Sequence, residues 1–346
     1  MKIDLPFLSW IKKSHTYKRW SKKRKLYKKT GFSDQQLKIL LINYFKSEED
    51  SDYEFRFENL GGVNNLGMYA CYKHKKKFAI AKLQYDNLAI RENCFMLWQQ
   101  KYLKNSLSTL SYGICRVNTN YSFLISEYLP KPGKVDHALV FELFLKMSEV
   151  STDTICELTE ERTVAAIVNQ IQPTTKATIK SLVAYVVSNP NSKQAFDYLE
   201  NYFIERKPLL ERHCEFENLY DQCFHFLSSL SRIDLSPHTG LVHGDFKWQN
   251  IMHSPNESGY RMIDLQYYTV GIRLWDLAFF YAKQSLPISE IIHLTNIYYP
   301  CSLFERRLFS FLYILVAILH IKPHRAKSLV LEKALPALEI LSKNNE

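Results

Sequence analysis

Residues 241–252 have the sequence LVHGDFKWQNIM, and two short acidic stretches follow it, MIDL at 262–265 and LWDLA at 274–278. Asp245 comes after an apolar run and a glycine, so we expect it to project from a sharp turn at the end of a strand. Asn250 lies five residues further on, and Asp264 ends the next apolar run. The spacing predicts a loop that carries an acid and an amide, with a second acid close by.

These residue types suit phosphoryl transfer. That reaction needs a carboxylate to receive the proton of the acceptor hydroxyl, hard oxygen ligands for Mg²⁺, and positive charge on the phosphates. Asp245 is the candidate for the proton acceptor. The oxygens of Asn250 and Asp264 suit Mg²⁺ and do not suit zinc.

The pattern H-G-D-x-x-x-x-N, then apolar-Asp, then D-L-A resembles the aminoglycoside phosphotransferase and choline kinase family. The resemblance implies that Asp245 is the catalytic aspartate and that Asn250 and Asp264 are the two Mg²⁺ ligands. It also implies that Asp276 braces the catalytic loop and that His243 has a structural role. The expected activity is transfer of phosphate from ATP to a hydroxyl group.

The resemblance extends upstream, so that it spans residues 60 to 280. Lys82 resembles the strand lysine that holds the nucleotide phosphates, and Glu92 resembles the helix glutamate that pairs with this lysine. Glu127 resembles the first residue of the hinge segment whose backbone contacts adenine. A turn between two predicted strands resembles the phosphate-covering loop of the family, with Gly61, Gly62 and Asn64. The resemblance therefore implies a nucleotide site as well as a catalytic loop.

Two alternatives to a small-molecule kinase stay open. Lys247 stands two residues after Asp245, as a lysine does in protein kinases, and is a candidate to contact the γ-phosphate. However, Asp264 is followed by Leu-Gln and not Phe-Gly, and no Ala-Pro-Glu segment follows, which argues against a protein kinase. The other alternative is a non-catalytic nucleotide-binding module, which would need none of these polar residues.

Periodicity along the chain predicts an α+β, bilobal protein-kinase-like fold. A capping-box pattern at 33–36 predicts the start of a helix. We expect a small β-rich N-lobe over 31–129, for nucleotide binding, and a larger helical C-lobe over 130–346, for the catalytic loop and acceptor. The predicted strands are 53–57, 68–72, 78–81 and 121–128, with a strand–loop–strand at 240–265. The predicted helices are 87–103, 137–149, 158–171, 176–187, 193–205 and 216–231, and further helices begin at 275.

The positive charge of the chain is concentrated in residues 1–30. The net charge is +10, and this segment holds 11 Lys and Arg against one acid. Aromatic residues interleave with the basic ones, so the segment can lie on an anionic membrane surface. A plain basic tail is the alternative, and contact with nucleic acid is disfavoured. No apolar run of signal-peptide length follows the basic start.

The seven scattered cysteines form no C-x-x-C pair, which favours reduced thiols in the cytoplasm. Residues 308–321 form an apolar run that is too short for a membrane span and predict a buried helix. We therefore expect a cytoplasmic protein, peripheral at the inner face of a membrane if residues 1–30 bind there. The acceptor is expected to be a small molecule or sugar, such as an amino alcohol, an aminoglycoside or an envelope glycan.

Overall fold

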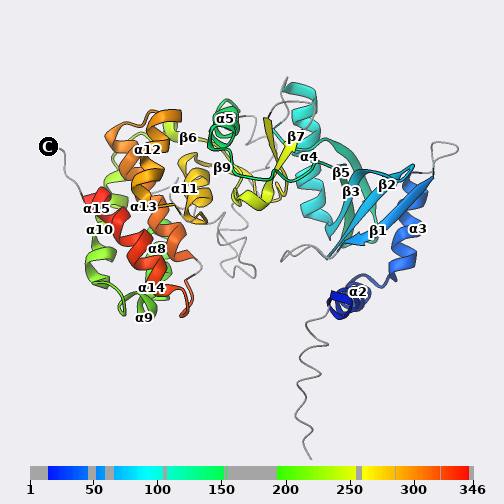
Figure 1. The fold of residues 1–346 in the computed structure, drawn as a ribbon. Helices are drawn as coiled ribbons and strands as arrows, with labels where there is room; N and C mark the ends of the chain where they lie inside the picture. Colours follow the sequence, from blue (N-terminus) through cyan, green and yellow to red (C-terminus); the bar gives the residue numbers. More distant parts are fainter. Residues whose placement is uncertain are drawn as a thin grey trace, which may run out of the picture. The chain divides into compact units, whose positions relative to one another are not determined.

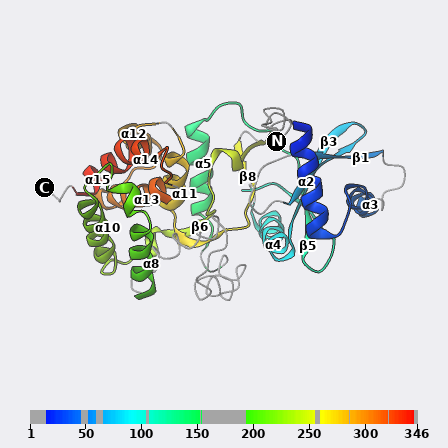
Figure 2. The ribbon, with the colours of Figure 1, turned by 90° about the horizontal axis from the view of Figure 1, so that it is seen from below.

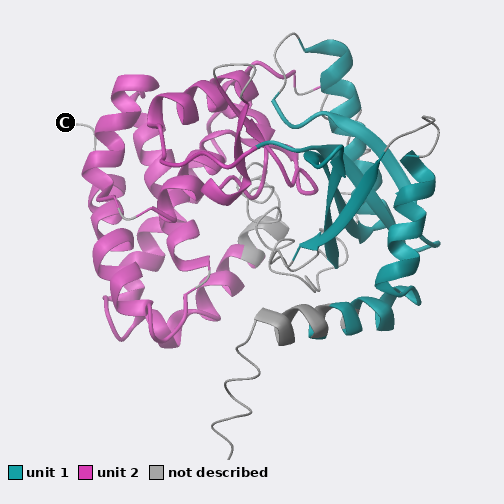
Figure 3. Ribbon diagram, turned by 45° about the vertical axis from the view of Figure 1, so that its right-hand side comes forward, with its two compact units in different colours: residues 1–129 teal, residues 130–346 magenta. Residues whose placement is uncertain are grey.

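The computed structural model divides the chain into two compact units, residues 1–129 and 130–346 (Figure 3). The structure describes residues 15–45, 52–58, 66–103, 107–151, 153, 193–254, 259–284, 286–319 and 321–342. The predicted helices at 158–171 and 176–187 lie outside the described residues.

The first unit is built on a five-stranded antiparallel sheet with the order β1-β2-β3-β5-β4 (Figure 1). Four of its strands are predicted from the sequence, the first by alternating apolar residues and the others by short apolar runs. They are β1 (Tyr53–Glu58), β2 (Gly67–Lys73), β3 (Lys76–Tyr85) and β5 (Tyr121–Glu127). The fifth, β4 (Ser111–Arg116), lies at the edge and was not predicted. The β2–β3 turn consists of His74 and Lys75, both at positive φ.

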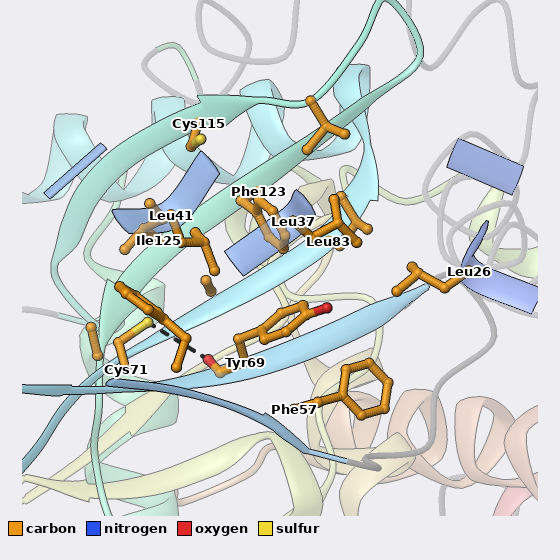
Figure 4. Close-up of a cluster of buried hydrophobic side chains, with 14 residues drawn as sticks. Leu26, Leu37, Leu41, Phe57, Tyr69, Cys71, Leu83, Cys115, Phe123 and Ile125 are labelled. Atoms are coloured by element: carbon orange, nitrogen blue, oxygen red, sulfur yellow. Dashed lines mark hydrogen bonds between the residues drawn. The ribbon is translucent and has the colours of Figure 1, made fainter. Parts of the chain in front are cut away.

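Two helices, α2 (His15–Thr30) and α3 (Asp34–Phe45), pack on one face of this sheet (Figure 4). They bury Leu26, Leu37 and Leu41 against strand side chains such as Phe57. The predicted capping box is present, because the amide N–H of Ser33 donates to the Gln36 Oε1 at 2.8 Å and that of Gln36 to the Ser33 Oγ at 3.3 Å. Part of the basic segment is therefore a helix that contributes Leu26 to the core.

The other face of the sheet is covered by α4 (Asp86–Tyr102). Successive residues of a strand point to opposite faces. On β5, Phe123 and Ile125 join the core beneath α2 and α3, whereas Leu124 packs with Met96 of α4. Lys82 pairs with Leu124 across the sheet. The alternation therefore directs Lys82 toward α4.

The helix α3 offers a direct test of this core. We expect Leu41→Ala to lower the free energy of unfolding by about 2–5 kcal/mol, because truncating a fully buried leucine removes apolar contacts and leaves a cavity. Ile39 on the same helix is 47% exposed, so Ile39→Ala is the matched control, with an expected change within about 0.5 kcal/mol. Chemical denaturation of the full chain measures both values. Equal effects of the two substitutions would contradict the placement of α3.

The second unit is mainly helical. Its long helix α13 (Leu303–Leu319) packs against α11 (Leu274–Ala282) and α15 (Leu335–Ser342), as Figures 1 and 2 show. Residues 308–319 of α13 are all buried, which confirms the predicted buried helix. In the described part of the chain, no helix has the length and apolar character needed to cross a membrane. The other α-helices in the described part of this unit are α5 (His137–Ser148), α8 (Lys193–Ile204), α9 (Lys207–Leu210), α10 (Phe216–Leu230), α12 (Ile288–Tyr298) and α14 (Ala326–Leu329).

Two small antiparallel ribbons within this unit carry residues 241–252 and 262–265. One pairs β6 (Thr239–Val242) with β9 (Thr269–Ile272), and the other pairs β7 (Ile251–Ser254) with β8 (Gly259–Met262). Residues 243–250 connect β6 to β7, and residues 263–268 connect β8 to β9. The two motif loops therefore begin and end on paired strands, which fixes their ends.

Candidate active site

The loop after β6 is anchored by the buried carboxylate of Asp276 on α11. Its Oδ2 accepts from the amide N–H of His243 at 2.6 Å, and its Oδ1 accepts from that of Gly244 at 3.2 Å. Gly244 has φ +78°, a conformation that side chains disfavour, so a glycine is required at this turn. The bracing contact that the resemblance implies for Asp276 is present.

His243 is fully buried and uses both ring nitrogens inside the loop. Nε2 lies 2.9 Å from the carbonyl oxygen of Ile263, and Nδ1 accepts from the amide N–H of Asp245 at 3.2 Å. A neutral imidazole with its proton on Nε2 satisfies both contacts. His243 thus ties the loop after β6 to the loop after β8, a structural role as the resemblance implies.

The Asp276 carboxyl gives a testable pH dependence. Burial raises the pKa of Asp276 from 3.8 to about 7, against the opposing effect of its two hydrogen bonds. The folded protein therefore binds a proton that the unfolded chain releases between these pH values. Stability contributed by this group falls as pH rises from about 4 to about 7, by up to about 1.4 kcal/mol per pH unit.

We expect Asp276→Asn to flatten that part of the pH dependence, because an amide has no proton to release in this range. The measurement is the free energy of unfolding of wild type and variant at pH 4.5, 5.5, 6.5 and 7.5. If the variant kept the wild-type slope, other groups would be responsible for it.

Asp245 is buried and lies at the centre of the loop. Its Oδ2 forms an ion pair with the Lys247 Nζ and accepts from the Asn250 Nδ2 at 3.2 Å. The same Nδ2 donates to the carbonyl oxygen of Asp245 at 2.9 Å. The structure therefore brings three of the predicted residues together, and it orients the Asn250 side chain through its nitrogen.

The predicted metal ligands lie on adjacent loops. The amide N–H of Ile263 donates to the carbonyl oxygen of Asn250 at 2.9 Å, and Asp264 is the next residue. Asp264 has φ +67°, an uncommon backbone conformation for a residue other than glycine, and its Oδ1 accepts from the Gln266 Nε2 at 2.9 Å. Strained backbone of this kind is frequent at functional sites.

The donor chemistry of this region fits magnesium. Asn250 has its nitrogen committed to the loop, which leaves its oxygen as the donor, and Asp264 adds a carboxylate. Mg²⁺ in nucleotide sites takes one or two protein ligands and completes its shell with phosphates and water. Among the described residues, no three His, Cys, Asp or Glu side chains gather into a metal site.

In the first unit, Lys82 and Glu92 form the predicted ion pair, with 3.0 Å between Nζ and Oε2. Glu92 is 2% exposed and Lys82 12% exposed, so the pair is largely shielded from water. Gln84 donates its Nε2 to the same Oε2 at 3.2 Å. Sequence reasoning missed Gln84, although its position two residues after Lys82 on a strand places both side chains on the same face.

Of the other residues predicted to bind the nucleotide, the structure describes only Glu127. Glu127 ends β5, where its carboxylate accepts from the amide N–H of Leu110 at 3.2 Å. Its own amide N–H donates to the carbonyl oxygen of Leu110 at 2.9 Å. Gly61, Gly62 and Asn64 lie outside the described residues.

Comparisons with known proteins find one matching family model and solved structures of similar fold. The sequence model of the ecdysteroid kinase-like family matches residues 145–300, which include the loop and Asp264 and Asp276. The structure is similar to an ethanolamine kinase from Plasmodium vivax, with 17% identity, coverage of 94% of this chain and 93% of that chain, and a TM-score of 0.52. It is also similar to aminoglycoside 2'-phosphotransferase-IIIa in its GDP complex, with 11% identity, coverage of 89% and 96%, and a TM-score of 0.50. No curated protein matches the sequence.

At these identities the structural matches establish the fold alone. The predicted fold class, an antiparallel sheet unit followed by a helical unit, is confirmed. The resemblance to kinases of the choline and aminoglycoside type is confirmed in the same way. The chain therefore has the protein-kinase-like fold that small-molecule kinases share.

Proposed function

We propose that this protein is an ATP- and Mg²⁺-dependent kinase that phosphorylates a hydroxyl group of a small molecule or sugar. The observation that carries the proposal is the loop in which Asp245 contacts both Lys247 and Asn250 while Asp276 holds the backbone. A loop with a buried acid, an amide and a lysine in contact suits transfer of a phosphoryl group to a hydroxyl.

In the proposed reaction, Asp245 accepts the proton of the acceptor hydroxyl as the oxygen attacks the γ-phosphorus of ATP. The bond from the γ-phosphorus to the β–γ bridging oxygen breaks, and ADP leaves with that oxygen. Lys247 holds the carboxylate in place and contributes positive charge near the transferred group. Asn250 and Asp264 would hold Mg²⁺, which supplies neutralisation of the charge on the phosphates. Lys82, held by Glu92, binds the phosphates of the nucleotide, and Gln84 donates to the same Glu92 carboxylate.

The acceptor that we propose is a small molecule or sugar with a free hydroxyl group. Amino alcohols and aminoglycosides are suggested by the names of the structural neighbours, and an ecdysteroid by the name of the matching family. Sugars of envelope glycans belong to the same class of hydroxyl acceptors. All four bring an alcohol oxygen as nucleophile, which is what the loop around Asp245 requires.

The test is transfer of labelled γ-phosphate from Mg·ATP to a panel of these four acceptors, with generic proteins included. Label on one small-molecule acceptor establishes the kinase and its substrate class. Label on the proteins alone would favour a protein kinase. Nucleotide binding without label on any acceptor, together with unchanged ATP after long incubation, would favour a non-catalytic module.

We also propose that the basic segment, residues 1–30, holds the enzyme at an anionic membrane surface on the cytoplasmic side. The helix α2 carries no acid, and its Lys28, Lys29 and Tyr27 are exposed. Leu26 is buried in the first unit, so the helix is fixed to the body of the protein. Removing the whole segment would damage that core, and a charge change is the sharper test.

We expect Lys28→Glu with Lys29→Glu to weaken binding to vesicles of anionic lipid by at least about 30-fold, since each lysine near such a surface is worth about 1 kcal/mol. Turnover of a water-soluble acceptor is expected to stay the same. The matched control is Lys322→Glu with Lys327→Glu, two exposed lysines of the second unit with the same change of charge. Equal loss of vesicle binding in both doubles would reject a specific role for α2.

A further inference from the structure

Gln266 is a buried glutamine beside the proposed metal ligand Asp264. Only one of its two side-chain polar atoms has a hydrogen-bond partner among the described residues. Its Nε2 donates to the Asp264 Oδ1 at 2.9 Å. Its Oε1 is buried and has no hydrogen-bond partner among the described residues. The carboxylate fixes which way the amide points, because only the nitrogen can donate to it. A buried acceptor without a hydrogen-bond donor lowers the stability of the folded protein by about 1–3 kcal/mol. Such an atom is therefore expected to have a partner when the protein is in use.

A structural glutamine in the same chain looks different. Gln99 of α4 is fully buried, and its Nε2 donates to the carbonyl oxygens of Ser108 and Thr109 at 3.0 and 3.2 Å. Its Oε1 accepts from the amide N–H of Ser108 at 2.7 Å. Both polar atoms of Gln99 are therefore satisfied within the protein, as is usual for buried amides.

A second buried glutamine with only one hydrogen-bonded polar atom lies beside the proposed phosphate-binding pair of Lys82 and Glu92. Gln84 donates to Glu92, and its own Oε1 is also buried and lacks a partner among the described residues. In each unit, considered separately, the unsatisfied amide oxygen belongs to the glutamine that holds a proposed functional carboxylate. Each of these two oxygens can therefore still accept a hydrogen bond from a group that binds there.

We infer that Gln266 is a positioning residue for magnesium: its N–H orients the Asp264 carboxylate, and its Oε1 accepts a hydrogen bond from a water of the metal ion. This inference rests on the proposed function. Mg²⁺ gives up its water reluctantly and keeps several molecules when it binds protein. Groups around such a shell orient the ligands, and their loss typically reduces metal affinity 10–100-fold.

The alternative is that Gln266 only fills space and stabilises the loop. In that case its replacement would change the melting temperature and leave the metal dependence alone. Methionine has nearly the same length as glutamine and lacks both polar atoms, so Gln266→Met separates these two roles.

The experiment is calorimetric titration of ADP into wild type, Gln266→Met and Gln99→Met at a series of Mg²⁺ concentrations. We expect Gln266→Met to raise the Mg²⁺ concentration for half-maximal ADP binding by about 10–100-fold. At saturating Mg²⁺ its ADP affinity should return to within about 3-fold of wild type, because Asp264 is still present. Gln99→Met should lower the melting temperature and leave the Mg²⁺ requirement unchanged.

A second variant keeps the inference testable if Gln266→Met does not fold. Gln266→Glu keeps an acceptor oxygen but puts a second carboxylate beside Asp264, where like charges repel without metal. Its melting temperature should therefore rise more on addition of Mg²⁺ than that of wild type.

The outcomes separate this inference from the proposed function. An unchanged Mg²⁺ requirement in Gln266→Met, or a Mg²⁺-induced shift in Gln266→Glu no larger than in wild type, would overturn the role of Gln266 alone. A wild type whose ADP binding is independent of Mg²⁺ would overturn the proposed function, and the role of Gln266 with it.

Discussion

Asp245→Asn is expected to lower kcat by about 10²–10⁴, the range that loss of a general base typically produces. The amide cannot take the proton of the acceptor hydroxyl, although it has nearly the shape of the carboxylate. It also removes the negative charge that Lys247 contacts. Nucleotide affinity should be retained, because the proposed nucleotide contacts of Lys82 and Asp264 do not involve this carboxylate.

The measurement is steady-state turnover with the acceptor found in the transfer panel, together with a separate titration of nucleotide binding. Asp221→Asn, at an exposed position on α10, makes the same chemical change and should turn over as wild type does. Wild-type turnover in Asp245→Asn would remove Asp245 from the proposed role. A loss of nucleotide affinity equal to the loss of turnover would instead show that the substitution disturbs the loop.

The parts of the fold that follow from local rules were predictable. The capping box at Ser33 and Gln36 needs only neighbouring residues, and it is present in the structure. The strand β1 alternates because one of its faces is buried in the core, whereas β2, β3 and β5 were predicted from short apolar runs. The spacing from Asp245 to Asn250 identified the loop because both residues serve the same turn.

The missed elements depend on tertiary structure. β4 contains Gly113 at φ +113°, and its pairing with β5 shifts register between Ser111 and Gly113. This irregularity breaks the alternation that a strand prediction needs. β9 has four residues, Thr269–Ile272, and pairs with the distant β6. A strand that short is defined by its partner and not by its own sequence.

The sequence allowed us to predict the residues of the candidate site, but not the side chains that hydrogen-bond to them. The motif identifies Asp264, but it does not reveal that the residue adopts φ +67° or that Gln266 holds its carboxylate. Likewise, the pairing of Lys82 with Glu92 was expected, whereas the contribution of Gln84 was not. Supporting residues of this kind carry no motif, because any side chain of suitable length and chemistry can serve.

Asp264 provides the second large effect. We expect Asp264→Ala to abolish the Mg²⁺-dependent part of nucleotide binding, a loss of more than about 100-fold, beyond the 10–100-fold typical of groups around the metal shell. The carboxylate is the proposed charged ligand, and Asn250 alone offers the ion only a neutral oxygen. Titration of Mg·ATP against metal-free ATP measures the effect directly.

Alanine at this position changes the backbone as well as the ligand. Asp264 has φ +67°, a conformation in which alanine costs about 1–2 kcal/mol and asparagine is tolerated. Asp264→Asn is therefore the better matched variant, since it keeps the backbone preference and removes only the charge. If both variants lose Mg²⁺-dependent binding, the negative charge of Asp264 is required. If only Asp264→Ala does, the charge is not required, because asparagine keeps both an oxygen donor and the backbone conformation. Normal Mg·ATP titration in both would exclude Asp264 as a metal ligand, and it would leave the proposed roles of the loop around Asp245 and of the Lys82–Glu92 pair unaffected.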